Sequence, residues 1–339
     1  MRKRAYPEFH KALMDPAMYP QVSRKIKFEE SPDSYFYKTG TDVYKIRKPS
    51  PVYSSLAIKE AFMQEAATLG RRWAPGLTVE ALPLVRRDGG FVLGGQGDAA
   101  DYVLRISQLS TQHWLNHLLE AGRCTPTVIG RVARFLAALH AEHPAPAGTA
   151  ETAGRPEHLR GLLEEIFYQS KKYTGTALSE TMLEVVTRPT MRFIEESRKL
   201  FLRRVKKGRI VDGHGAFVPE HIHVRGKDVL AVSPLDGQAK YRMLDATNDV
   251  AALVNALALA GEDELAELFV KRYATAAKDR DLDRTLPVYR VFQAVHNGLR
   301  LCERSAQVGL EEELRAAWQQ QAQRQYQHAV QLVRLIPRG

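Results

Sequence analysis

Histidines and carboxylates gather in one short segment about two thirds of the way along the chain. Residues 211–221 read VDGHGAFVPEH, which places Asp212, His214 and His221 close together, and Asp236 follows in the segment VSPLD. Imidazole and carboxylate groups transfer protons and hold cations near neutral pH. The segment is therefore a candidate catalytic loop for phosphoryl transfer, which needs a carboxylate to receive the acceptor proton and further groups to hold a metal ion.

A second pair of charged residues lies near the N-terminus. Lys45 follows Val43 and Tyr44 on a predicted strand, and Glu65 lies inside the apolar stripe of a predicted helix. A carboxylate on a buried face needs a partner, and Lys45 is the natural candidate. In kinases a strand lysine held by a helix glutamate binds the α- and β-phosphates of ATP. Lys48 is a rival with the opposite strand parity, and a lone strand lysine is more often an exposed solubilising residue.

The elements around this pair are mostly strands. Aromatic and β-branched residues on both sides of the turn 39–42 predict a hairpin over 34–48. Apolar residues at steps of three and four predict a helix over 56–73. Further strands are predicted at 79–85, 91–93 and 102–106. We expect a five-stranded sheet with one long helix, allowing for a weaker strand near Ile26.

The pattern becomes helical after residue 110. An apolar stripe predicts a helix over Ile129–Leu139, and a loop rich in Pro, Ala and Gly is predicted at 144–154. Helices are predicted at 158–173, 179–207 and from 247 to the end, interrupted by a strand-like entry at 209–212 and a hairpin of 221–224 with 229–232. The order predicts an α+β fold of the protein-kinase-like type: an N-lobe at 1–109 and a larger helical C-lobe at 110–339 that carries the catalytic-loop hairpin at 209–236.

These motifs together resemble the aminoglycoside phosphotransferase family, whose catalytic loop reads HGDxxxxN/H. The most similar subfamily has a loop DGHGDLRPEH and is often fused to a P-loop ATPase. Its segments are matched in order by VYKIRKP at 43–49, by Glu65 with RRWAP at 71–75, by DYVLR at 101–105 and by LDATND at 244–249. No GxxxxGK[ST] motif occurs in the 339 residues, so we expect the ATPase module to be absent from this chain.

The departures from the family pattern fall on the groups that perform the chemistry. The resemblance places Ala216 at the catalytic Asp, and it places Ser233 at the metal-binding Asp of the family's DCIEF segment. Alanine cannot accept a proton, and Mg²⁺ prefers carboxylate and phosphate oxygens to a serine hydroxyl. Loss of one preorganised polar group typically slows catalysis about 10²–10³-fold. His214 is retained, and the metal-binding positions that survive are His221 and Asp236.

The resemblance therefore implies a pseudokinase that binds ATP with weak or absent need for Mg²⁺ and acts as a binding or regulatory module. It places Ser34 in the hairpin that covers the phosphates, and Arg105 and Gln108 in the segment whose backbone meets the adenine. The alternative is an active ATP-dependent small-molecule phosphotransferase that uses the displaced carboxylates of Asp236 and Asp212. Asp212 has a competing role in bracing the loop.

Composition limits the partners and the compartment. The net charge of +10 favours anionic partners such as nucleotides. The dense basic run at 198–209 is either the solvated face of a helix that ends near Gly208 or a docking patch; no nucleic-acid-binding motif supports the second reading, so nucleic acid is not the expected partner. Cys124 and Cys302 form no CxxC pair, which fits a reduced, cytoplasmic protein. The apolar stretch 251–260 is too short for a membrane helix. A small-molecule or protein partner stays open.

Overall fold

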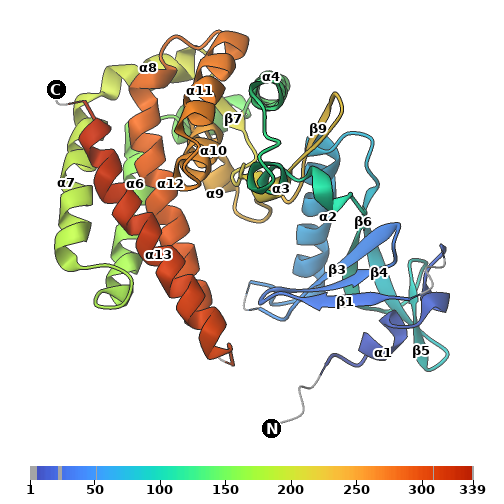
Figure 1. Cartoon of the computed structure of the whole chain (residues 1–339). Helices are drawn as coiled ribbons and strands as arrows, with labels where there is room; N and C mark the ends of the chain where they lie inside the picture. Colours follow the sequence, from blue (N-terminus) through green and yellow to red (C-terminus); the bar gives the residue numbers. More distant parts are fainter. Residues whose placement is uncertain (1–5, 22–24, 51, 308, 338–339) are drawn as a thin grey trace. The chain divides into compact units, whose positions relative to one another are not determined.

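The chain forms two compact units (Figure 1). The computed structural model describes residues 6–21, 25–50, 52–307 and 309–337. The first unit comprises Met1–Gln112 together with Leu230–Gly237, and the second comprises His113–Val229 with Gln238–Gly339. The first unit is built on a sheet and the second is mostly helical, so the predicted α+β class is confirmed.

The first unit contains one six-stranded antiparallel sheet in the order β1-β2-β3-β6-β4-β5. The predicted hairpin is confirmed, and the weaker strand expected near Ile26 begins at Lys27. The long helix α2 has the predicted bounds and begins after Ser55, whose hydroxyl accepts a hydrogen bond from the Ile58 amide. The strands are β1 (Lys27–Glu30), β2 (Ser34–Lys38), β3 (Asp42–Arg47), β4 (Val79–Arg87), β5 (Gly90–Leu93) and β6 (Ala99–Ser107); the helices are α1 (His10–Leu13), η1 (Pro16–Met18) and α2 (Leu56–Trp73).

The alternation along β3 separates a packing face from a polar face. Tyr44 and Ile46 are buried in one apolar cluster, whereas Lys45 and Arg47 belong to the opposite face of the strand. On that opposite side Leu104 of β6 packs with Met63 of α2 in a second cluster. The sheet and α2 therefore hold two strand cations at fixed positions beside the helix.

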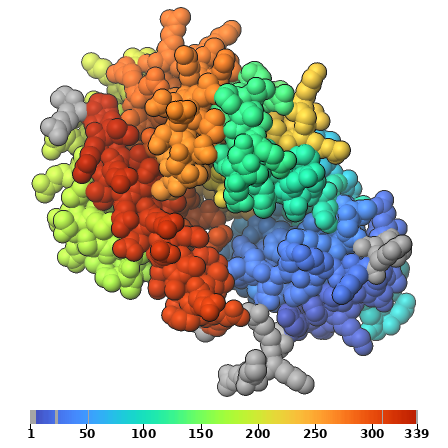
Figure 2. Space-filling view, viewed as in Figure 1, coloured from blue at the N-terminus to red at the C-terminus, as the bar shows by residue number. Residues whose placement is uncertain are grey.

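The second unit is a helical assembly with two small antiparallel sheets. β7 pairs with β10, and β8 with β9 forms the predicted hairpin. The long helices α12 and α13 pack along one another (Figures 1 and 2). The helices are α3 (Leu115–Glu120), α4 (Pro126–Glu142), α5 (Ala147–Ala153), α6 (Pro156–Ser170), α7 (Glu180–Glu196), α8 (Arg198–Lys206), α9 (Ala239–Arg242), α10 (Thr247–Leu259), α11 (Asp263–Ala277), α12 (Leu282–Ser305) and α13 (Glu312–Leu332), with short 3₁₀ turns η2 (Thr111–His113), η3 (Lys171–Tyr173), η4 (Pro219–His221) and η5 (Val333–Leu335); the strands are β7 (Ile210–Asp212), β8 (Ile222–Arg225), β9 (Asp228–Ala231) and β10 (Met243–Asp245). Among the described helices none is long and apolar enough to cross a bilayer.

Three local predictions for this unit are wrong. The segment 144–154 contains the helix α5, because its alanines favour helix once Pro146 has been passed. The helix predicted over 179–207 is two helices, since the carbonyl of Ser197 starts α8 by accepting bonds from the Leu200 and Phe201 amides. The strand β10 was not predicted, because its three residues gain hydrogen bonds only by pairing with the distant β7.

The basic run 198–209 is mostly a solvent-facing surface, as expected, with one buried cation, Arg204. The Arg204 side chain is only 1% exposed. It forms ion pairs with Asp245 and with Asp279 (2.8 Å), and its Nη2 donates to the Thr247 hydroxyl (3.0 Å). These two carboxylates raise the pKa of the guanidinium although burial alone would lower it. Arg204 therefore joins α8, β10 and the segment after α11 through one buried charge.

The neighbouring cations of the run are also paired. Arg203 and Lys207 share the carboxylate of Asp281, at 2.9 Å each. Arg209 donates to the carbonyls of Ala277 and Lys278, at the C-terminal end of α11, where a cation is favourable. These contacts tie Arg203, Lys207 and Arg209 to neighbouring elements of the second unit, while the Arg203 and Lys207 side chains stay 41% and 48% exposed.

Replacing Arg204 with Leu is expected to lower the free energy of unfolding by about 3–5 kcal/mol, because it leaves two buried carboxylates without their cation. The measurement is urea unfolding followed by far-UV circular dichroism. Arg203→Leu is the matched control; its guanidinium is more exposed, and it is expected to cost at most about 1 kcal/mol. Equal losses for the two variants would contradict the prediction.

Candidate nucleotide site and catalytic loop

The candidate catalytic loop is fixed by one buried carboxylate in the second unit. Asp249, near the start of α10, accepts hydrogen bonds from the amides of His214 (2.6 Å) and Gly215 (2.8 Å). His140 of α4 lies with its Nε2 3.1 Å from the same carboxylate, and its Nδ1 is 2.8 Å from the Tyr273 hydroxyl. Burial would raise the pKa of Asp249, but the hydrogen bond and charge of His140 and the contacts of His214 lower it. The loop is thus anchored by an ionised group.

Gly213 is the residue that lets the loop approach this carboxylate. A methyl group built on its Cα would lie 2.5 Å from Asp249 Oδ2 and 3.3 Å from the backbone oxygen of Arg242. The Gly213 amide itself donates to the Arg242 carbonyl at 3.3 Å. Position 213 therefore accepts no side chain without moving the anchor.

The predicted loop residues His214, Ala216 and His221 lie close to one another. His214 is fully buried and packs its ring against Phe217. His221 Nδ1 lies 2.9 Å from the carbonyl oxygen of Ala216, so the two positions flank one turn of chain. Ala216 contributes a methyl group where the resemblance expects a carboxylate.

Asp212, at the end of β7, is held by an arginine of α9. Its Oδ1 accepts a hydrogen bond from Arg242 Nε at 2.5 Å, and the Arg242 side chain is almost completely buried. Arg242, Asp249 and His140 were not singled out from the sequence. Asp249 lies in the LDATND match, which was the one signal for it; Arg242 and His140 gave none.

In the first unit the phosphate-side candidates share one face of the sheet. Ser34 pairs across strands with Arg47, and Phe36 pairs with Lys45, so their side chains lie on the same side. The Lys45 ammonium lies 5.9 Å from the centre of the Phe36 ring. Burial and the nearby charge of Arg47 lower the pKa of Lys45 to about 8, although Asp236 and Asp33 oppose this shift.

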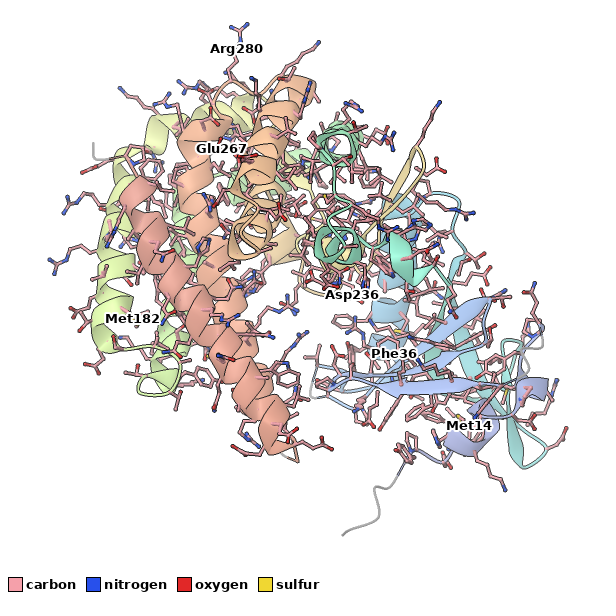
Figure 3. The ribbon with its side chains drawn as sticks, viewed as in Figure 1. Met14, Phe36, Met182, Asp236, Glu267 and Arg280 are labelled. Atoms are coloured by element: carbon pink, nitrogen blue, oxygen red, sulfur yellow. The ribbon has the colours of Figure 1, made fainter. Side chains whose placement is uncertain are left out.

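The segment 230–237 brings Asp236 to this face (Figure 3). Both oxygens of Asp236 accept hydrogen bonds from Arg47 Nη2, at 2.7 and 2.6 Å. Gly237, next in the chain, donates its amide to Glu65 Oε2 at 3.1 Å. Glu65 thereby fixes the segment that carries Asp236. The contact between Glu65 and Lys45 that the sequence suggests stays a prediction.

The remaining candidates of this unit lie elsewhere. The Arg105 side chain is paired with Asp42 (3.1 Å) and with Glu80 (3.5 Å) on the face opposite Lys45. The backbone amide of Gln108 donates a hydrogen bond to the Thr41 carbonyl. The rival Lys48 forms an ion pair with Glu30 and lies over the Tyr35 ring. Residues 105–109 are expected to meet the adenine through their backbone groups, and this role stays a prediction.

The face that carries Ser34, Lys45 and Arg47 offers one hydroxyl and two cations. The Ser34 hydroxyl is fully buried and has no hydrogen-bond partner among the described residues. An acceptor oxygen from a phosphate would satisfy it, beside the cations Lys45 and Arg47. For metal ions the part of the chain that the structure describes has no group of three or more His, Cys, Asp or Glu placed to hold one. The metal-binding role expected of His221 and Asp236 stays a prediction.

Comparison with solved structures identifies the class of fold. A choline/ethanolamine kinase family protein from Mesorhizobium loti matches with a TM-score of 0.53 at 13% identity, over 96% of this chain and 98% of that one. Choline kinase from Cryptosporidium parvum matches with a TM-score of 0.53 at 11% identity (91% and 88%). A protein from Ralstonia eutropha assigned to the aminoglycoside phosphotransferases gives 0.54 at 14% identity (96% and 97%). The chain therefore has the kinase-like fold of these phosphotransferases, as the resemblance implied.

Comparison with known sequences is less informative about this chain than comparison with solved structures. No family model matches the chain. Proteins named "Uncharacterized protein Rv2004c" from Mycobacterium tuberculosis and "Uncharacterized protein Mb2027c" from Mycobacterium bovis are each 22% identical over 211 residues, which is 62% of this chain. The chain spans 42% of the length of these relatives. The names of these relatives state no activity or substrate.

Replacing Gly213 with Ala is expected to lower the free energy of unfolding by about 1–3 kcal/mol, because the new methyl group overlaps the Asp249 carboxylate. Gly161→Ala is the matched control: it lies within α6 with open space around it and is expected to stabilise by about 0.5–1 kcal/mol. Thermal unfolding of both variants checks the pair. A stabilised Gly213→Ala protein would show that the loop is not held against Asp249.

The pKa of Lys45 predicts a pH-dependent stability. Its folded value of about 8 lies below the ordinary 10.5, so the unfolded chain binds this proton more tightly. The resulting destabilisation is complete below pH 8 and disappears as the pH rises through 10.5. Lys45→Met is therefore expected to raise the free energy of unfolding at pH 7, by at most about 3 kcal/mol, and to raise it less at pH 9.5. Thermal unfolding at both pH values, with the exposed Lys27→Met as control, tests this; an equal gain at both would contradict it.

Proposed function

We propose that this protein is a nucleotide-binding pseudokinase: a kinase-fold protein that holds ATP or ADP but does not transfer the phosphoryl group, and that acts as a binding or regulatory module. The observation that carries the proposal is Ala216, which stands in an anchored loop at the position where the related catalytic loop has its proton-accepting carboxylate. Alanine offers no atom for that step.

The anchoring of the loop argues that chemistry was lost from an otherwise preserved scaffold. Asp249 holds two successive amides of the loop, and His221 contacts the carbonyl of Ala216. These contacts fix the backbone conformation of the loop, which a loop that had lost its catalytic shape would not require. The missing carboxylate is therefore a local loss, and the surrounding geometry supports a protein that still uses the fold.

The displaced carboxylates of the alternative function are already engaged. Asp212 is held by the buried Arg242, and Asp236 is held at both oxygens by Arg47. Each of these carboxylates therefore already has a cation as its partner, which a metal ion or an acceptor proton would have to displace. The active phosphotransferase is thus the second candidate.

Nucleotide binding is supported by the first unit. Lys45 lies on the third strand at the position of the phosphate lysine in kinases, and the buried Ser34 hydroxyl lies on the same face. ATP is the cofactor that the fold implies, and Mg²⁺ is expected to contribute little. We further propose a cytoplasmic location and a protein or small-molecule partner.

ATP or ADP at ten times its dissociation constant is expected to raise the unfolding midpoint by roughly 3 °C, since binding to the folded state alone adds about 1.4 kcal/mol. No phosphate release above background is expected from the wild-type protein. Differential scanning fluorimetry and a coupled ATPase assay measure the two quantities. Absence of a shift with every adenine nucleotide would overturn the binding half of the proposal.

The double reversion Ala216→Asp with Ser233→Asp is expected to create Mg²⁺-dependent ATP hydrolysis. The backbone at Ser233 has φ of +56°, a conformation that Asp adopts more readily than most residues. Ala216→Asn with Ser233→Asn is the matched control, with similar shape and no charge. Turnover by the wild-type protein that is abolished by Asp236→Asn would favour the active phosphotransferase instead.

A further inference from the structure

The Arg47 side chain lies where a metal-dependent site would need free carboxylate oxygens. It is on β3, two residues after Lys45 and on the same face, and 17% of its side chain is exposed. Its Nη2 contacts both oxygens of Asp236, and its Nη1 lies 3.7 Å from Asp33 in the turn between β1 and β2. Burial alone would lower the pKa of Arg47, but these two carboxylates raise it. The guanidinium is therefore a permanent charge in this part of the first unit.

The arginine and a metal ion compete for the same oxygens. Mg²⁺ binds carboxylate oxygens at about 2.0–2.1 Å and in near-octahedral geometry. To reach Asp236 it would have to displace a guanidinium from both oxygens and then lie beside that cation. Ser233, three residues earlier, offers only a hydroxyl. The residues present do not fit a divalent cation.

The same face fits an anion. Lys45 and Arg47 are two cations, and Asp33 is the exposed member of the cluster, at the end of a weak 3.7 Å contact. The buried Ser34 hydroxyl, paired across the strands with Arg47, has no acceptor among the described residues. A phosphate oxygen would replace the weak Asp33 contact and accept from the serine, and charge-assisted bonds of this kind are about twice as strong as neutral ones.

We propose that Arg47 is a built-in cation that replaces the divalent metal, so that the site takes a nucleotide di- or triphosphate in its metal-free form. The inference rests on the proposed nucleotide binding and adds to it the ionic form of the ligand and the residue that selects it. Asp236 acts as a positioning residue that holds the guanidinium in place. Metal-complexed ATP, which carries less negative charge, binds more weakly.

The test is calorimetric titration of the full chain with ATP, once in EDTA and once with excess Mg²⁺. The wild-type protein is expected to bind ATP more tightly in EDTA than with Mg²⁺, and equal affinity in the two buffers would contradict the proposal. Arg47→Gln is expected to weaken binding in EDTA about 10- to 100-fold, the loss of one charged hydrogen-bonding partner, and to make added Mg²⁺ strengthen binding because Asp236 is released. Arg86→Gln is the control; it removes an exposed arginine paired with Glu8 and is expected to change neither value.

The outcomes separate the two proposals. If the wild-type protein binds no nucleotide in either buffer, the proposed function fails. If it binds ATP only with Mg²⁺, nucleotide binding stands and the role of Arg47 is overturned. Should Arg47→Gln not fold by circular dichroism, Asp236→Asn serves instead: it keeps the cation and only loosens its position, so metal-free binding is expected to weaken by less than tenfold and to persist. Loss of metal-free binding in a folded Asp236→Asn protein would contradict the proposal.

Discussion

A buried carboxylate with three hydrogen-bond donors holds the candidate catalytic loop of the second unit in place. Asp249 lies at the start of α10, where the helix N-terminus favours negative charge. It binds two successive loop amides and the imidazole of His140, and Tyr273 orients that imidazole in turn. An isolated buried carboxylate would be costly, and these donors offset that cost. Helices α4, α10 and α11 and the loop after β7 are thereby joined at one point.

In the first unit the candidate site residues are held together by a cation and not by a carboxylate. There a cation, Arg47, organises the site by holding Asp236, while Glu65 and Gly237 fix the segment that brings Asp236 to the sheet. In the second unit Arg204 is a further buried cation, held by two buried carboxylates.

Local sequence patterns predicted most of the elements, because their signals lie within a few residues of one another. The helix α2 and the hairpin of β2 and β3 were recovered at their bounds. The family resemblance pointed to Ala216 and Ser233, which spacing alone would not have singled out. What remained unpredicted depends on residues far apart in the chain: Arg47 with Asp236, His140 with Asp249, Arg204 with Asp279. No periodicity marks such partners, and a strand of three residues such as β10 exists only through its pairing with β7.

The late segment Leu230–Gly237 has a consequence for the order of assembly. Its glycine lies against the Phe62 ring so closely that a Cβ atom there would fall 1.8 Å from the ring, and its φ is +65°. More than a hundred residues separate this segment from Gln112, where the rest of the first unit ends. At ribosomal elongation rates that gap takes on the order of 10 s to synthesise. During this interval the nascent sheet and α2 lack the segment Leu230–Gly237. The first unit is therefore complete only after helices α3 to α8 have been synthesised.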